Sequence, residues 1–249
     1  MMIDTHCHIF KEYYDDIEKI VNSMDGYMIC AGTKDTDNQE VIELVSKYDK
    51  VYGVLGIQPE EISEITENSF KLIEENINNP KIVGIGEIGL DYHWVSDNKE
   101  EQIKVFKRML DLARKYNKPV VVHSRDAAQD TFNILKDYSD LKIDLHCYSG
   151  SLELAREYVK MGVMIGVGGV LTFKNSKKLV EIVKEIPIEN ILLETDSPYL
   201  SPEPFRGKTN APENVLLVAK KIAEIKGISV EKVLEITSQN AIRQFDLNI

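Results

Sequence analysis

Four of the five histidines in this chain, together with two acidic residues, stand where they could bind metal ions. His6 and His8 lie in the stretch IDTHCHIF near the N-terminus, and the other candidates are spread along the chain. Imidazole and carboxylate groups suit Zn²⁺, Mn²⁺ and related divalent ions. The candidate metal ligands are His6, His8, Glu87, His123, His146 and Asp196.

Each candidate ligand falls at the end of a short run that has the character of a β-strand. These runs are rich in Val, Ile and Leu and are bounded by Gly, Pro or polar residues, which is typical of strands. The predicted strands cover residues 1–8, 26–32, 50–57, 81–89, 119–124, 142–147, 162–169 and 190–196.

Helical stretches separate the predicted strands. The clearest covers residues 99–116, where Ile103, Phe106 and Leu110 recur at helical spacing. We expect Asp97 to cap this helix, with Glu100 at the capping-box position.

Alternation of strands and helices predicts a parallel sheet of the α/β class. Eight such units in 249 residues predict a (β/α)8 TIM barrel that forms a single domain over residues 1–249. An open doubly wound sheet is the alternative, but no Gly-x-Gly-x-x-Gly follows the first strand. In a barrel the C-terminal ends of the strands form one face, and active sites are built there. The six candidate ligands are therefore expected to meet at one mouth.

Strand parity separates the ligands from their neighbours near the N-terminus. Side chains alternate between the two faces of a strand, so Asp4, His6 and His8 share one face and Cys7 points the other way. We expect Cys7 to pack against helices. We expect Asp4, deeper on the ligand face, to orient the imidazole of a metal ligand without binding the metal itself. Six ligands are too many for one catalytic ion with an open position, and they suit two ions that share a carboxylate.

Composition limits the functions that the chain can have. The formal net charge of −11 argues against a broad nucleic-acid-binding face, although a cation-filled pocket can still hold a phosphate. The three scattered cysteines do not suggest a disulfide framework. No run is long and apolar enough for a membrane span and no signal peptide is recognisable, so we expect a cytoplasmic protein with no membrane partner.

Six motifs, in order along nearly the whole chain, resemble those of the TatD family of metal-dependent deoxyribonucleases, which belongs to the amidohydrolase-like barrels. They are DTHCH (4–8), GEIGLDYHW (86–94), HSRDA (123–127), HCYSG (146–150), ETDSPYL (194–200) and the Pro-rich run 202–212. The resemblance implies two divalent metal ions per chain (Zn, Mn, Mg or similar). It also implies cleavage of DNA phosphodiester bonds, with a 3′–5′ exonuclease on single-stranded DNA as the form we favour.

The resemblance also implies a role for each ligand. Metal-activated water would attack the phosphorus, with Glu87 and Asp196 as the catalytic carboxylates and Asp196 able to take up the proton. The implied ligands are His6, His8 and Asp196 for the first ion, His123 and His146 for the second, and Glu87 as the bridge.

Two arginines are candidates for phosphate contact because guanidinium groups match phosphate oxygens. For Arg125 the alternative is a salt bridge with Asp126 or Asp130, and for Arg206 it is a solvated loop. The residues expected to line the pocket are Gln58, Tyr92, His93 and Tyr199, and Trp94 beside them could stack on a base.

Gln58 is a departure from the family. Many members have Gly-x-His-Pro where this chain has Gly56-Ile57-Gln58-Pro59, and an amide cannot titrate near neutral pH.

Two other functions stay open. One is a small-molecule amide, lactone or ester hydrolase, or an aminoacyl-tRNA deacylase, with the same metal centre. The other is a non-catalytic metal-bearing protein. We expect a monomer or weak oligomer.

Overall fold

A computed structural model describes all residues from 1 to 249. It contains one eight-stranded parallel sheet in which the strands follow one another in chain order, β1 to β8. The strands are β1 (Met2–Cys7), β2 (Gly26–Ala31), β3 (Val51–Leu55), β4 (Ile82–Asp91), β5 (Val120–Arg125), β6 (Ile143–Leu145), β7 (Met164–Val167) and β8 (Ile191–Leu193). All eight predicted runs contain a strand, and the predicted (β/α)8 barrel is confirmed.

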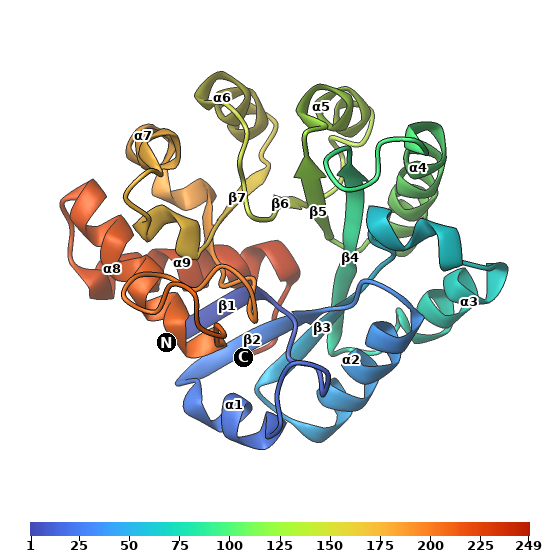
Figure 1. The fold of residues 1–249 in the computed structure, drawn as a ribbon, viewed down its shortest axis with the longest axis horizontal. Coiled ribbons are helices and arrows are strands. Elements are labelled where there is room, and N and C mark those ends of the chain that lie inside the picture. Colours follow the sequence, from blue (N-terminus) through green and yellow to red (C-terminus); the bar gives the residue numbers. More distant parts are fainter.

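Nine α-helices accompany the sheet, and Figure 1 shows α1 to α8 in a ring around the strands. None of them is both long and apolar enough to cross a membrane. They are α1 (Ile17–Ser23), α2 (Asp35–Lys47), α3 (Glu67–Asn76), α4 (Lys99–Tyr116), α5 (Ala128–Lys136), α6 (Leu152–Lys160), α7 (Lys177–Glu185), α8 (Val215–Lys226) and α9 (Val230–Phe245).

The start of α4 differs from the sequence prediction. The helix covers the expected residues, but its N-cap is Asn98, and Asp97 does not cap it. The side-chain oxygen of Asn98 accepts a hydrogen bond from the amide of Gln102, which also donates to the carbonyl of Asp91. The hydrogen bonds of Gln102 to Asn98 and Asp91 therefore stand where the local sequence predicts a capping box of Asp97 and Glu100.

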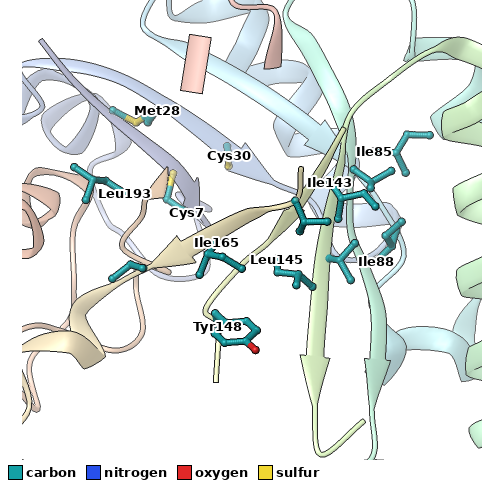
Figure 2. Close-up of a cluster of buried hydrophobic side chains, with 14 of the residues drawn as sticks. Cys7, Met28, Cys30, Ile85, Ile88, Ile143, Leu145, Tyr148, Ile165 and Leu193 are labelled. Carbon is teal, nitrogen blue, oxygen red and sulfur yellow. The ribbon is translucent and has the colours of Figure 1, made fainter. Parts of the chain in front are cut away.

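Alternation along the strands divides the core into two parts. The larger cluster has 54 buried residues from the outer strand faces and the helices, and Figure 2 shows Cys7 among them. The thiol of Cys7 donates to the carbonyl of Ile29, which confirms that Cys7 packs away from the ligand face. A second cluster of 12 buried residues includes inward-facing side chains such as Val54 and Val121, together with Phe245 of α9.

Helix α9 closes the N-terminal end of the barrel. The Asn240 amide donates to the carbonyls of Ile188 and Ile191, just before and at the start of β8. The hydroxyl of Ser238 donates to the carbonyl of Met1. Helix α9 therefore covers the N-terminal end of the barrel, opposite the candidate ligands.

At the other end, the residues that follow β8 join it to β1. The backbone N–H of His8 donates to the carbonyl of Ser197 at 2.7 Å, and the N–H of Asp196 donates to the carbonyl of His6 at 2.9 Å. This nearly completes the barrel and holds the first and last candidate ligands against each other.

Candidate metal centre

The six candidate ligands meet at the C-terminal end of the barrel. They come from β1, β4 and β5, from the residues directly after β1 and β6, and from the third residue after β8. They form three overlapping groups, in each of which the potential ligand atoms lie within 4.8 Å of one another. The groups are His6, His8 and Glu87; His6, His146 and Asp196; and Glu87, His123 and His146.

Glu87 lies at the centre of this arrangement, and its two carboxylate oxygens face different pairs of histidines. Oε2 is 3.3 Å from Nε2 of His6 and 3.6 Å from Nε2 of His8. Oε1 is 3.0 Å from Nδ1 of His123 and 3.2 Å from Nε2 of His146. Burial alone would raise the pKa of Glu87, but the imidazoles of His146, His123 and His6 outweigh it and hold the pKa well below its usual value.

The backbone of neighbouring strands fixes the position of Glu87. Its N–H donates to the carbonyl of Gly32, which follows β2, at 2.9 Å. Gly56, which follows β3, packs directly against it, because a Cβ there would lie 2.4–2.5 Å from backbone atoms of Gly86 and Glu87. A side chain at position 56 would therefore displace the central carboxylate.

Asp196 completes the cluster on the β1 side. Its Oδ1 is 3.5 Å from Nε2 of His8 and 3.8 Å from Nε2 of His6. Its side chain is 15 % exposed whereas that of Glu87 is 2 % exposed, so Asp196 is the carboxylate of the cluster that solvent reaches.

The histidines are held by bonds that direct particular nitrogens toward Glu87. Nδ1 of His8 donates to the carbonyl of Ala31 at 2.8 Å, which leaves Nε2 facing the carboxylates. Burial disfavours the charged form of His8, but Asp196 and Glu87 outweigh this and raise its pKa to about 9. The ring of His6 stacks on that of His146 with centroids 3.9 Å apart, and burial lowers the pKa of His6 to about 4.

Asp91, which is not among the predicted site residues, holds His123. Its Oδ2 is 2.9 Å from Nε2 of His123, so the imidazole directs Nδ1 toward Glu87. Burial alone would lower the pKa of His123, but Asp91 and Glu87 raise it to about 10. A signal existed in the sequence, because Asp91 lies four residues after Glu87 on the same strand, and even spacing places both on one face.

Asp4 has a different task from the one expected. Its carboxylate accepts from the N–H and hydroxyl of Thr195, at 3.0 and 2.6 Å, and from the N–H of His6 at 3.2 Å. It bonds to no imidazole nitrogen, so the expectation that it orients an imidazole is wrong. Asp4 instead ties the backbone before Asp196 to β1, and burial raises its pKa to about 7.

Two of the four predicted pocket residues adjoin the cluster. The amide of Gln58 donates to Oε1 of Glu87 at 3.3 Å, and the ring of Tyr199 lies 6.3 Å from that of His8, centroid to centroid. Tyr92 and His93 instead bond to acidic residues beyond β5. The Tyr92 hydroxyl donates to Asp130 at 2.9 Å, and His93 pairs with Asp126 at 3.0 Å.

The two candidate phosphate-binding arginines lie against aromatic rings. The guanidinium carbon of Arg125 is 5.2 Å from the ring centroid of Trp94, and that of Arg206 is 4.2 Å from the ring centroid of Phe173. Neither arginine forms a salt bridge, so the alternative interpretation of Arg125 as an ion-pair partner of Asp126 or Asp130 is wrong.

The donor set fits divalent metal ions. Four imidazoles and two carboxylates converge, and two of the imidazoles, His8 and His123, are oriented by bonds through their other nitrogen, as metal-bound histidines usually are. A barrel with such a cluster at its C-terminal mouth has the arrangement of a metal-dependent hydrolase, in which bound ions activate water.

Comparison with known proteins gives the family. The family model described as "TatD related DNase" matches residues 3–246, and the chain therefore belongs to the TatD family. The chain is 40 % identical over 255 residues to the uncharacterized metal-dependent hydrolase YabD of Bacillus subtilis, with 100 % of both chains covered. It is 33 % identical to human deoxyribonuclease TATDN3, with 98 % of this chain and 94 % of that protein covered.

A solved structure agrees with these relatives. The TatD homologue YJJV from Escherichia coli superposes with a TM-score of 0.92 at 28 % identity, covering 99 % of this chain and 98 % of that one. The sequence prediction of a TatD-type metal-dependent hydrolase is confirmed.

Proposed function

We propose that this protein is a deoxyribonuclease that uses two divalent metal ions to cleave phosphodiester bonds, acting from the 3′ end of single-stranded DNA. The observation that supports two ions is the position of Glu87, whose oxygens each face a separate pair of histidines. A carboxylate that faces ligands on both sides is the arrangement expected of a bridge between two metal ions.

The proposed ligand roles follow the geometry. His6 and His8 would hold one ion with Asp196, whose oxygen faces both of them. His123 and His146 would hold the other, with Glu87 between the two pairs of histidines. Bound divalent ions lower the pKa of coordinated water and offset negative charge on phosphoryl oxygens.

The chain's own residues then divide the remaining work. Asp196 is the carboxylate that solvent reaches, so it is placed to take up the proton of the attacking water. Gln58 donates to Glu87 and keeps the bridging carboxylate aligned. Because an amide does not titrate near neutral pH, Gln58 positions Glu87 without exchanging protons.

DNA as the substrate rests on the family description and on the name of the human relative. The −11 net charge of the chain does not favour long-range attraction of DNA. Binding would therefore depend on contacts at the mouth of the barrel, and it should be strongest for a short, flexible single strand that can enter it.

The test is digestion of a single-stranded oligonucleotide labelled at its 5′ end, with Mg²⁺, Mn²⁺ or Zn²⁺ and with EDTA. We expect a ladder that shortens from the 3′ end in the presence of metal, and no cleavage in EDTA. The Glu87→Gln variant should lose cleavage by at least 100-fold, because a neutral amide cannot bridge two cations. Glu213→Gln, at an exposed residue just before α8, is the matched control.

The outcomes separate the competing functions. Absence of cleavage with every metal would refute the nuclease proposal. Faster hydrolysis of lactones or acyl amides than of any phosphodiester would favour a small-molecule hydrolase, and Glu87→Gln should abolish that activity too. Equal activity of Glu87→Gln and the unmodified protein would place the chemistry elsewhere.

A further inference from the structure

The only tryptophan of the chain stands exposed at the mouth of the barrel. Trp94 follows β4, seven residues after Glu87, and 63 % of its surface is open to solvent. Large aromatic rings are usually at least half buried in a folded domain, since their exposure to water is unfavourable. An exposed ring beside a catalytic centre is therefore a candidate contact for substrate.

Trp94 is anchored to the same residue that holds the metal centre. Oδ1 of Asp91 accepts hydrogen bonds at 2.8 Å from the backbone N–H groups of His93 and Trp94. Oδ2 of the same carboxylate bonds to His123 at 2.9 Å. One buried side chain thus sets the position of the exposed ring relative to a proposed metal ligand.

A free cation lies beside the ring. Arg125, at the end of β5 and two residues beyond His123, has its guanidinium carbon 5.2 Å from the Trp94 ring centroid. The adjacent acidic residues are already engaged, Asp126 with His93 and Asp130 with Tyr92. Arg125 forms no ion pair, although the chain carries 41 acidic residues. Its guanidinium is therefore available to an external anion.

We propose that Trp94 and Arg125 form a nucleotide subsite, in which a nucleobase stacks on Trp94 and a phosphate of the same strand binds Arg125. This inference rests on the proposed function, and it names the part of the substrate that the mouth recognises. A base stacked on an aromatic ring with an arginine on the backbone is the usual combination in proteins that bind single strands. Guanidinium groups match two phosphate oxygens at once.

The same geometry predicts the strand type and the specificity. Every base has a π face, so stacking on Trp94 should tolerate any sequence. Bases within a duplex already stack on their neighbours, so only an unpaired base can use the ring. The subsite therefore favours single-stranded or frayed ends over intact duplexes.

The sole tryptophan supplies the assay. Intrinsic fluorescence of the full-length protein is titrated in EDTA with a short single-stranded oligonucleotide and with an abasic sugar–phosphate oligomer of equal length. We expect saturable quenching by the oligonucleotide and at least fivefold less by the abasic oligomer at the same concentration. Arg125→Gln should weaken the oligonucleotide titration by about tenfold, while Arg156→Gln, whose guanidinium pairs with Glu185 on α7, should leave it unchanged.

Cleavage kinetics with added metal provide the second measurement. Trp94→Ala should raise KM for the oligonucleotide by about 5- to 100-fold with little change in kcat, and Trp94→Phe should restore most of the loss. Quenching that is absent, or equal for the abasic oligomer, would overturn the subsite even if the protein cleaves DNA. Quenching by normal strands without cleavage would uphold the subsite and refute the nuclease.

Discussion

Replacing Asp91 by Asn removes one charge from the residue behind His123 and changes little else. The Asn oxygen can still accept from the N–H groups of His93 and Trp94, which lie 2.8 Å from Oδ1. The Asn amide NH₂ takes the place of Oδ2, which lies 2.9 Å from Nε2 of His123. Since an NH₂ group can only donate, the neutral, metal-binding form of His123 must accept at Nε2 and carry its single proton on Nδ1.

That shift disables the nitrogen that faces the centre. Nδ1 of His123 lies 3.0 Å from Glu87, and once protonated it has no lone pair to offer a metal ion. Loss of such a supporting carboxylate typically lowers metal affinity by about 10- to 100-fold, or about 1.4–2.7 kcal/mol. The metal-free fold should lose only about 1–2 kcal/mol, because one charge-assisted hydrogen bond becomes a neutral one.

The assay is competition for Zn²⁺ and Mn²⁺ between the protein and a chelator of known affinity, with unfolding in EDTA as the check on the fold. Asp91→Asn tests the bond to His123 more specifically than Asp91→Ala does, because Ala would also leave two backbone donors without their acceptor. Asp126→Asn is the matched control, since its carboxylate also pairs with a histidine, His93, but its side chain is 66 % exposed. Unchanged affinity of a well-folded Asp91→Asn for both metals would refute the reasoning.

Three further outcomes follow from the same structure. Adding the bound metal at 100 times its Kd should stabilise the protein by about 2.7 kcal/mol relative to EDTA, seen as a higher Tm; an unchanged Tm would argue against a site in the folded state. Metal affinity should rise between pH 6 and 8, because the pKa values of about 9 for His8 and about 10 for His123 keep both imidazoles protonated in that range and metal binding must displace those protons. The expected rise is about tenfold per pH unit for each proton released. Calorimetry in buffers of different ionisation enthalpy would count the protons, and zero release would contradict the proposal. Phe245→Ala should lower the free energy of unfolding in urea by about 3–5 kcal/mol, because Phe245 is 1 % exposed and belongs to the second cluster of 12 buried residues. The metal affinity of the folded variant should stay the same.

Much of the frame was predictable from the sequence, because it depends on local patterns. Runs of Val, Ile and Leu bounded by Gly and polar residues identified all eight strands, and their alternation with helices identified the barrel. Strand parity separated His6 and His8 from Cys7, since side chains alternate regardless of what surrounds the strand. Residues at the ends of parallel strands share one face of a barrel, and so the six ligands were expected to meet.

The pairings within that face were decided only by tertiary structure. Which histidines face which oxygen of Glu87 depends on strand register, on Gly32 and on the close approach of Gly56, and these are relations between distant segments. The position of Asp91 on β4 predicts that its side chain shares a face with Glu87. The sequence spacing of Asp91 and His123 does not predict the hydrogen bond between them, because they lie on different strands.

Local signals also failed where a distant partner was stronger. Asp97 has the spacing of an N-cap, but the N-cap in the structure is Asn98, and the amide of Gln102 in the first turn donates to the carbonyl of Asp91. Asp4 was on the ligand face, yet Thr195 from the other end of the chain took its hydrogen bonds. A sequence determines which face a side chain is on, whereas the partner it meets there depends on how the strands and loops are brought together in three dimensions.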